Sequence, residues 1–212
     1  MSSPNQITSN IPILKAKQVD GHSLKLVNAS VLDTEFILAV RTDAKKSKYL
    51  SRVEPDFEKQ YSWLQQYNSD SSQAYFIIYD RNSNRIGTVR IYSPIGDSFC
   101  WGSWILVDGV PVTAAMESAL IIYRYALYLG FRKAHFDVRK ANCSVWEFHE
   151  MCGATRVSET ETDIFYDMPN GAIQEMLNLY ARYLPNGITI TPVDPNSTNG
   201  TFVAPNGTCS RS

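Results

Sequence analysis

The chain has 212 residues, of which 44% are hydrophobic, 12% aromatic and 19% charged. This globular composition excludes a disordered, collagen-like or coiled-coil protein, and a chain of this length can bury a core without disulfides or a structural metal. The 20 basic and 21 acidic side chains give a net charge of −1, which excludes a bulk basic field for wrapping nucleic acid.

The cysteines and the hydropathy pattern indicate an intracellular protein. No two cysteines form a C-x-x-C pair and the three histidines complete no zinc-ligand pattern, so we expect free thiols and no metal site. The first residues lack the layout of a signal peptide, and no run approaches the roughly 18 apolar residues of a membrane span. We expect a cytoplasmic protein with no nucleic acid and no membrane as partners. The cysteines are Cys100, Cys143, Cys152 and Cys209.

Hydrophobic periodicity predicts an alternation of strands and helices along the chain. The predicted strands are residues 23–30, 74–80, 86–92, 98–106, 135–138, 154–159 and 164–168. The predicted helices are residues 33–41 with Asp33 as the cap, a helix beginning at Pro55, and residues 113–129, 144–151 and 170–183. This order implies an α/β (α+β) fold, with a mixed sheet of about 6–7 strands covered by helices.

Two tryptophans mark the strand at 98–106. Trp101 and Trp104 are an odd number of positions apart, so a regular strand would place them on opposite faces of the sheet. The helix at 113–129 is apolar nearly all round, which predicts burial, and Gly130 is its predicted C-cap.

The two ends of the chain differ in composition from its middle. The first residues are rich in Ser and Asn, and residues 192–212 hold Pro, Asn, Gly, Thr and Ser with little to bury. We therefore expect one domain at 23–185, between a flexible N-terminal segment at 1–22 and a flexible C-terminal tail at 186–212.

The most informative segment runs from the strand at 98–106 through a loop into the long helix. The first N–H groups of a helix lack internal partners and its dipole is positive there, so such a junction can bind a phosphate. Small residues at Thr113, Ala114 and Ala115 would let a pyrophosphate approach the backbone. A plain strand-to-helix connection is the alternative interpretation.

From Ser98 to Met168 the chain resembles the GNAT family of N-acetyltransferases, and most closely its ribosomal-protein N-terminal acetyltransferase branch. The family has a Q/R-x-x-G-x-G/A loop, whose last small residue aligns with Ala115, and Thr113 and Val110 then stand at the middle Gly and the Q/R. A second element, N-x-x-S/A-x-x-x-Y-x-x-x-G, matches at Asn142 and Gly153. Residues 58–64 resemble the E-x-x-x-x-W-L helix of the same branch, so that the resemblance covers about residues 23–168.

The resemblance implies a mixed, mostly antiparallel GNAT sheet flanked by helices, and acetyl-CoA as co-substrate. In this family main-chain groups of the strand hold the pantetheine arm, the loop binds the pyrophosphate, and the asparagine and its helix contact the cofactor. Carried over position by position, the cofactor-binding residues are Trp104, Ile105, Leu106, Val107, Val110, Pro111, Val112, Thr113, Ala114, Ala115, Asn142 and Trp146.

Acetyl transfer from a thioester to an amine needs a neutral amine, a donor to the thioester oxygen and a proton for the departing thiolate. An N–H of residues 104–107 is the candidate donor. His149 stands where many family members have a tyrosine and is the candidate catalytic acid, because imidazole titrates near neutral pH. Packing against Trp146 and Phe148, or contact with CoA, is the alternative role. The candidates for a base are Asp97, Glu117, His135 and Asp137.

The resulting hypothesis is an N-acetyltransferase that moves an acetyl group from acetyl-CoA to a primary amine by direct transfer. The amine belongs to a peptide or protein N-terminus or to an amino sugar, including a nucleotide-linked one. The aromatic positions Tyr75, Tyr92, Phe99 and Trp101 would suit a sugar. The alternative is a catalytically silent acyl-CoA-binding sensor or assembly module. We interpret Cys143 and Cys152 as small buried thiols rather than nucleophiles, and we expect a monomer or homodimer.

Overall fold

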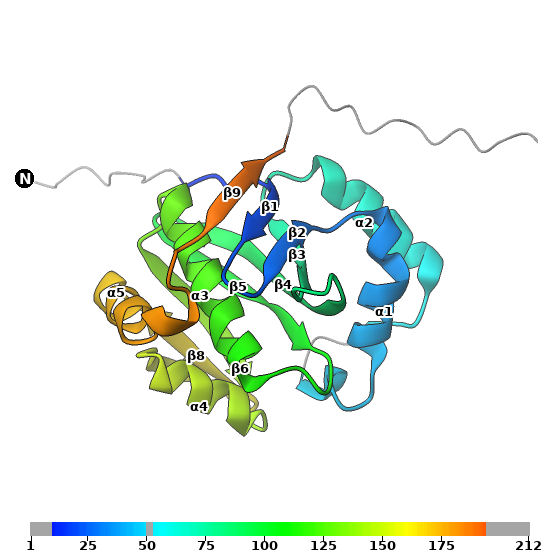
Figure 1. The fold of residues 1–212 in the computed structure, drawn as a ribbon. Helices are drawn as coiled ribbons and strands as arrows, with labels where there is room; N and C mark the ends of the chain where they lie inside the picture. The colour runs from blue at the N-terminus through cyan, green and yellow to red at the C-terminus, as the bar shows by residue number, and fades with distance from the viewer. Residues whose placement is uncertain (1–9, 50–52, 194–212) are drawn as a thin grey trace, which may run out of the picture.

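The computed structural model describes residues 10–49 and 53–193, which build one nine-stranded sheet with helices on both faces (Figure 1). The strands are β1 (Ala16–Asp20), β2 (Lys25–Asn28), β3 (Ala74–Tyr79), β4 (Arg85–Ile95), β5 (Ser98–Leu106), β6 (Lys133–Arg139), β7 (Thr155–Glu159), β8 (Asp163–Met168) and β9 (Thr189–Pro192). The helices are α1 (Thr34–Thr42), α2 (Phe57–Ser69), α3 (Val112–Leu129), α4 (Cys143–Met151) and α5 (Asn170–Leu179). Short 3₁₀ turns lie at Val31–Asp33, Ser47–Tyr49 and Ala181–Tyr183.

The order of strands in the sheet is β7-β8-β6-β5-β4-β3-β2-β1-β9, and all described pairs are antiparallel except β5 with β6. α1 and α2 cover one face of the sheet, while α3, α4 and α5 cover the other. This mixed, mostly antiparallel sheet confirms the predicted fold class, with two more strands than the upper end of the prediction.

The two additional strands correct the expected domain boundaries. β1 lies inside the segment expected to be flexible at 1–22, and β9 lies inside the expected tail at 186–212. They pair with each other, and their pairing joins residues far apart in the sequence, such as Val19 and Ile190. Each strand is only four or five residues long and carries little periodicity by itself, so its pairing comes from the tertiary structure. Residues 1–9 and 194–212 of the expected flexible ends lie outside the described residues.

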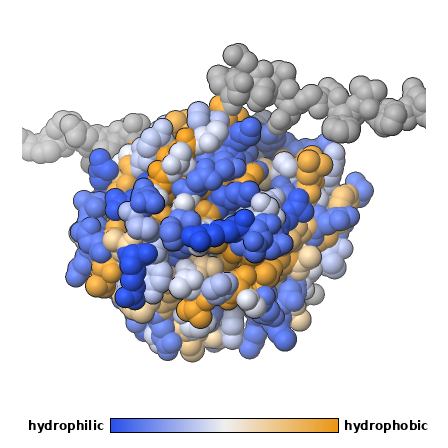
Figure 2. Space-filling model, viewed as in Figure 1, coloured by the Kyte–Doolittle hydropathy of each residue, from blue (hydrophilic) through white to orange (hydrophobic). Residues whose placement is uncertain are grey.

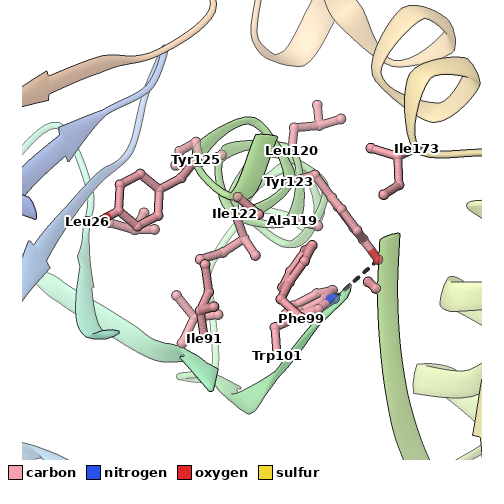
Figure 3. Packing of buried hydrophobic residues seen from close by; sticks show 14 of the residues in the cluster. Leu26, Ile91, Phe99, Trp101, Ala119, Leu120, Ile122, Tyr123, Tyr125 and Ile173 are labelled. Atoms are coloured by element: carbon pink, nitrogen blue, oxygen red, sulfur yellow. Dashed lines mark hydrogen bonds between the residues drawn. The ribbon is translucent and has the colours of Figure 1, made fainter. Parts of the chain in front are cut away.

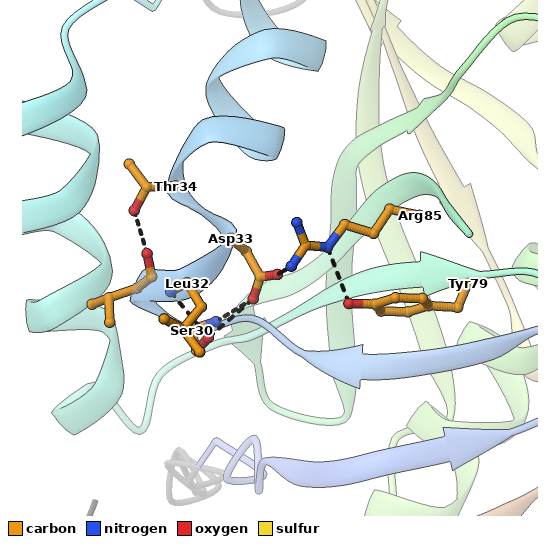
Figure 4. Close-up of polar contacts among 7 residues, drawn as sticks. Ser30, Leu32, Asp33, Thr34, Tyr79 and Arg85 are labelled. Atoms are coloured by element: carbon orange, nitrogen blue, oxygen red, sulfur yellow. Dashed lines mark hydrogen bonds and ion pairs between the residues drawn. The ribbon is translucent and has the colours of Figure 1, made fainter. Parts of the chain in front are cut away.

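The start of α1 differs from the predicted cap. Asp33 precedes the helix but its side chain makes no capping hydrogen bond to it; instead the carboxylate accepts the Ser30 N–H at 2.9 Å and the Ser30 hydroxyl at 3.1 Å (Figure 4). The same carboxylate pairs with Arg85 Nη2 at 3.0 Å, and the Arg85 Nε donates to the Tyr79 hydroxyl at 3.2 Å. Asp33 therefore joins the turn before α1 to the hairpin of β3 and β4.

The core lies between α3 and the sheet, as the apolar pattern of the helix predicted. Figure 3 shows α3 side chains such as Ile122 and Tyr123 pointing toward Ile91, Phe99 and Trp101 of the sheet. The Trp101 Nε1 donates a hydrogen bond to the Tyr123 hydroxyl at 3.1 Å. The helix ends at Gly130, whose φ of 105° is the left-handed conformation that a glycine C-cap adopts without strain.

One buried carboxylate interrupts this apolar helix. Glu117 is 2% exposed and accepts hydrogen bonds from the backbone N–H groups of His22, Ser23 and Leu24 at 2.8, 2.6 and 2.9 Å. The Ser23 hydroxyl donates to it as well. Glu117 therefore fixes the turn between β1 and β2 against α3.

The surface mixes polar and apolar residues on the face that Figure 2 shows. Large apolar side chains that are exposed, such as Leu32, Tyr128 and Leu179, come from different elements. In the part of the chain that the structure describes, no helix combines the length and apolar character needed to cross a bilayer.

Candidate active site

β5 and β6 begin side by side and then separate. Their described parallel pairs are Ser98 with Lys133 and Phe99 with Ala134, after which β5 continues against β4 while β6 continues against β8. β5 and β6 therefore diverge after their first residues and leave an opening within the sheet. Such an opening gives a ligand access to strand backbone that no neighbouring strand covers.

A β-bulge in β5 lies at this opening. Between the pairs Thr88–Ile105 and Arg90–Gly102, β5 has one residue more than β4, and Ser103 adopts a left-handed φ of 47°. A bulge shifts the alternation of side chains by one position. It therefore re-aims the residues that follow it along the strand.

The bulge overturns the prediction that the two tryptophans lie on opposite faces. The ring centroids of Trp101 and Trp104 are 5.2 Å apart, and both indoles reach α3. Trp101 donates to Tyr123, and the Trp104 Nε1 donates to the Ser118 hydroxyl at 3.1 Å. The prediction assumed a regular strand, and the extra residue in β5 removes that assumption.

A cavity of about 230 Å³ occupies the opening between the strands. Side chains from β4, β5, β6 and α4 line it, including the predicted site residues Trp104, Asn142 and His149. The tertiary structure thus brings Asn142 and His149, from the second element that resembled the GNAT family, next to Trp104 of β5, whereas no residue of the loop at 110–115 lines the cavity. We refer to this space as the reaction cavity.

His149 lies on α4 in an aromatic environment and is 5% exposed. Its ring centroid is 4.2 Å from that of Phe136 and 5.2 Å from that of Trp101. Burial disfavours the charged imidazolium and lowers the pKa of His149 from 6.5 to about 3. The imidazole is therefore neutral near physiological pH, and any proton that it provides comes from a neutral N–H.

The predicted pyrophosphate loop leads into α3 as expected. The helix begins at Val112 without a side-chain cap, and Val112 itself is 90% exposed, whereas the small Ala114 is buried. Thr113 and Pro111 are exposed as well. Uncapped N–H groups next to small residues fit an anionic group of a ligand.

Among residues 104–107, which were predicted to hold the pantetheine arm, Val107 differs from the other three. The Val107 N–H donates to the Ile86 carbonyl at 2.9 Å, so it is used within the structure. The candidate donors to a thioester oxygen therefore narrow to residues 104–106, which follow the bulge. Val110 is half-buried against the core on the way to the loop.

The two predicted cofactor residues at α4 have different surroundings. Asn142 is the residue before the helix, but its side chain makes no capping hydrogen bond and lines the reaction cavity. Trp146 lies elsewhere, because its Nε1 donates to the Lys140 carbonyl at 3.2 Å and its ring is covered by Arg156 at 4.9 Å. Of the two, Asn142 is the one placed to contact a ligand in the cavity.

The structure separates the four candidate bases. Asp137, on β6, is exposed and lines the reaction cavity. Asp97 forms an ion pair with Lys133 at 3.4 Å, the His135 Nδ1 lies 2.8 Å from the Ser98 hydroxyl, and Glu117 holds the turn between β1 and β2. Asp137 is therefore the candidate that the geometry favours.

The cysteines of the described residues are free thiols. Burial raises the pKa of Cys152 to about 12, which fits the expected inert thiol, whereas Cys143 is exposed and corrects that expectation. Among residues 10–49 and 53–193, no group of His, Cys, Asp and Glu side chains could hold a metal ion. Cys209 lies outside the described residues.

The charged part of the cavity was not predicted from the sequence. Arg41 of α1 and Arg90 of β4 both line it, together with Tyr49 and Tyr92. The available signal was Arg90, an arginine between the buried residues Val89 and Ile91 of a strand. The contribution of Arg41 had no such signal, because it depends on how α1 packs against the sheet.

No family model and no curated protein matches this chain. Among solved structures, it is 36% identical to one described as apo FdhC, a nucleotide-linked sugar GNAT, covering 84% of this chain and 99% of that one with a TM-score of 0.69. A GCN5-related N-acetyltransferase from Brucella melitensis is 13% identical, with 82% and 88% of the chains covered and a TM-score of 0.68.

A spermidine N-acetyltransferase from Vibrio cholerae, solved with CoA and spermine, is 16% identical, with 72% of this chain and 98% of that one covered and a TM-score of 0.64. The last two likenesses concern the fold alone, and the assignment to the ribosomal-protein branch stays a prediction. The 36% identity spans nearly the whole of the first structure. This chain is therefore an acyltransferase that belongs to the GNAT family of N-acetyltransferases.

Proposed function

We propose that this enzyme transfers the acetyl group of acetyl-CoA directly to the primary amine of a nucleotide-linked amino sugar. The observation that carries the proposal is the 36% identity to a nucleotide-linked sugar GNAT over 84% of this chain. The other acceptor class expected from the sequence was a peptide or protein N-terminus, and none of the three structures reported above is described as acting on one.

The residues present fit acetyl-CoA as co-substrate. The N-terminus of α3 has no side-chain cap and would offer the N–H groups of Val112 and Thr113 to the pyrophosphate, whereas the Ala114 N–H donates to the Pro111 carbonyl at 2.9 Å. The backbone of residues 104–106 borders the opening between β5 and β6, where it would hold the pantetheine arm, and Asn142 faces the same space. A structure with CoA bound is known for the Vibrio cholerae enzyme of the same fold.

The reaction cavity supplies groups for each requirement of direct transfer. The Asp137 carboxylate takes a proton from the ammonium form of the acceptor, so that the amine can attack the thioester carbon. An N–H of residues 104–106 donates to the thioester oxygen as it gains negative charge. The C–S bond then breaks, the new amide keeps the acetyl group, and the thiolate receives a proton.

Two groups can provide that last proton. The attacking nitrogen loses a second proton as the amide forms, and His149, which burial keeps neutral, can relay that proton by accepting it on one ring nitrogen while giving the proton of the other to the thiolate. Tyr92 lines the same cavity, and burial raises the pKa of its hydroxyl above the ordinary value, so it stays protonated. We propose His149 as the donor. Tyr92 is the second candidate, which would still be present in a variant that lacks His149.

A catalytically silent acyl-CoA-binding module is the alternative. The observation that favours it is the loop, where Val110 and Thr113 replace the Q/R and Gly of the family pattern. Cytoplasmic location and a monomeric or homodimeric state stay predictions from the sequence.

An acceptor panel tests these functions. Acetyl-CoA binding is measured by calorimetry, and release of the CoA thiol is followed with a nucleotide-linked amino sugar, the free amino sugar, a peptide N-terminus and spermidine. We expect the highest kcat/KM for the nucleotide-linked sugar. Binding of acetyl-CoA without thiol release on any acceptor would identify the silent module, and preference for a peptide or polyamine would refute the proposed substrate.

A further inference from the structure

The guanidinium of Arg90 lies half-buried between aromatic rings. It is 4.3 Å from the ring centroid of Tyr92 and 6.0 Å from that of Trp63. Its Nη1 donates to the Gln73 Oε1 at 3.2 Å, while its buried Nε has no hydrogen-bond partner within the described residues. No carboxylate of residues 10–49 or 53–193 forms an ion pair with it.

A partly buried arginine that has no counterion, and whose Nε is buried without a hydrogen-bond partner, is energetically unfavourable unless an anion completes its surroundings. Its guanidinium presents several N–H donors in one plane, and its contacts with the two rings and with Gln73 restrict its position. That geometry suits the oxygens of a phosphate or carboxylate. The arrangement around Arg90 therefore indicates an anionic ligand.

A second arginine reaches the same place from α1. Arg41 donates from Nη1 to the Ser103 hydroxyl at 3.2 Å, and Ser103 is the residue of the bulge with the left-handed φ. The neighbouring bulge residue, Gly102, is paired with Arg90 in the sheet. The bulge therefore brings the two positive charges to one point of the opening.

This point separates two cavities. Arg41 and Arg90 line the reaction cavity and also a neighbouring cavity of about 340 Å³ between α1, α2 and the sheet. The neighbouring cavity contains Trp63 together with Glu54 and Asp56. We call it the outer cavity.

The charges in the outer cavity indicate which part of a ligand would bind there. Lys59 pairs with Glu54 and with Asp56, at 3.6 Å in the second pair, so the cavity is not a field of free positive charge. Carboxylates repel phosphate but accept hydrogen bonds from the hydroxyls of a ribose. Trp63 adds an aromatic surface for a base. A nucleoside fits this cavity better than a phosphate does.

We propose that Arg90 and Arg41 bind the diphosphate of a nucleoside diphosphate-linked acceptor, with its amino sugar in the reaction cavity and its nucleoside in the outer cavity. The proposal rests on the proposed function, because it assigns residues to a nucleotide-linked acceptor. It makes Arg90 and Arg41 the residues that select such an acceptor over the free amino sugar.

Calorimetry with dTDP, UDP and inorganic pyrophosphate tests the site. The protein is first saturated with CoA, so that none of these probes can bind in the cofactor's pyrophosphate site. The variants are Arg90→Gln, Arg90→Lys and Arg41→Gln, and their folding is checked by circular dichroism and thermal melting. Arg182→Gln is the matched control, since Arg182 also lies over a tyrosine ring, at 4.9 Å from that of Tyr183, but lines neither cavity.

We expect dTDP or UDP to bind the CoA-saturated protein, and to bind about tenfold or more weakly to Arg90→Gln and Arg41→Gln, because each loses charge-assisted hydrogen bonds. Arg90→Lys keeps the charge but loses the planar donors, and should also bind more weakly. The affinity of Arg182→Gln should equal that of the wild type. If neither nucleotide binds, or if the Arg90 and Arg41 variants bind as the wild type does, the proposed diphosphate site is wrong.

Measuring acetyl transfer by the same variants distinguishes a failure of the diphosphate site from a failure of the proposed function. Acetyl transfer to a nucleotide-linked amino sugar that is unaffected by the arginine substitutions would refute the diphosphate site and keep the proposed function. Arginine-dependent binding of dTDP or UDP without acetyl transfer to any amine would support the site and refute the function.

Discussion

Trp101 and Trp104 lie on the same face of β5, with their ring centroids 5.2 Å apart, although they are three positions apart in the strand. The bulge at Gly102 and Ser103 accounts for this arrangement. In the same bulge, Gly102 pairs with Arg90 of β4, and the Ser103 hydroxyl accepts a hydrogen bond from Arg41. One extra residue in β5 therefore positions both the tryptophans and the arginines that line the reaction cavity.

The placement of the cofactor can be tested at the start of α3. Ala115→Asp introduces a negative charge beside the proposed pyrophosphate, and at an effective dielectric of about 20 two like charges about 4 Å apart repel by roughly 4 kcal/mol. Calorimetry should show a large loss of acetyl-CoA affinity. The fold should be retained, because a carboxylate in the first turn of a helix interacts favourably with its dipole.

Ala115→Asn is the control that adds similar bulk without charge. It should weaken binding less than Ala115→Asp does. The difference in affinity between the two variants should be larger at low ionic strength, where the charge of the aspartate is less screened. Unchanged acetyl-CoA affinity in a folded Ala115→Asp protein would contradict the placement.

Asn142 is predicted to contact the cofactor rather than to cap α4. Because its side chain makes no capping hydrogen bond, Asn142→Ala should leave the melting temperature close to that of the wild type. The affinity for acetyl-CoA should fall by about 1–2 kcal/mol, the value of a lost hydrogen bond. Asn170→Ala, at the start of α5 and outside the reaction cavity, should change neither quantity. A lower melting temperature with unchanged affinity for Asn142→Ala would assign it a structural role.

Asp137 is predicted to be the base. Asp137→Asn removes the proton acceptor but keeps the size of the side chain, so kcat should fall by about 10²–10⁴, the usual contribution of general acid–base catalysis. The KM for acetyl-CoA should change little, because the proposed contact is with the acceptor. Asp97→Asn is the control, since its exposed ion pair with Lys133 lies outside the reaction cavity. Full kcat in Asp137→Asn would contradict this role and would assign the deprotonation of the acceptor amine to solvent.

The burial of His149 predicts a pH dependence of stability. Its pKa is about 3 in the folded protein and 6.5 in a solvated chain, so between these values the unfolded state binds a proton that the folded state does not. The free energy of unfolding therefore falls as the pH falls through this window, by about 1.4 kcal/mol per unit. Urea titrations at pH 7.5 and 5 should differ by about 2 kcal/mol more for the wild type than for His149→Phe.

His149→Phe is the informative variant because it keeps the aromatic packing against Phe136 and Trp101 but cannot titrate. An equal pH dependence in both proteins would show that folding does not lower the pKa of His149. The same variant also tests catalysis: a loss of kcat at all pH values from 6 to 9 fits donation by a neutral N–H, whereas full kcat would shift the role to Tyr92.

Much of the architecture was predictable from local pattern. The strand at β5, the buried helix α3, its end at Gly130 and the hairpin of β7 and β8 follow from periodicity and from glycine's conformational freedom, which act over a few neighbouring residues. The short strands β1 and β9 did not follow, because the pairing of β9 at the edge of the sheet with β1 joins residues separated by most of the chain's length.

The sequence by itself therefore determined the elements, the fold class and the family motifs around Ala115, Asn142 and His149. Only the tertiary structure decided which of the acidic candidates reaches the site, since the distant partners of Asp137 and Glu117 cannot be read from the local patterns of their strand and helix. It also decided that Arg41 and Arg90 meet, because their meeting depends on an extra residue in β5 and on the packing of α1 against the sheet. Contacts between residues so far apart in sequence leave no periodic signal in either segment.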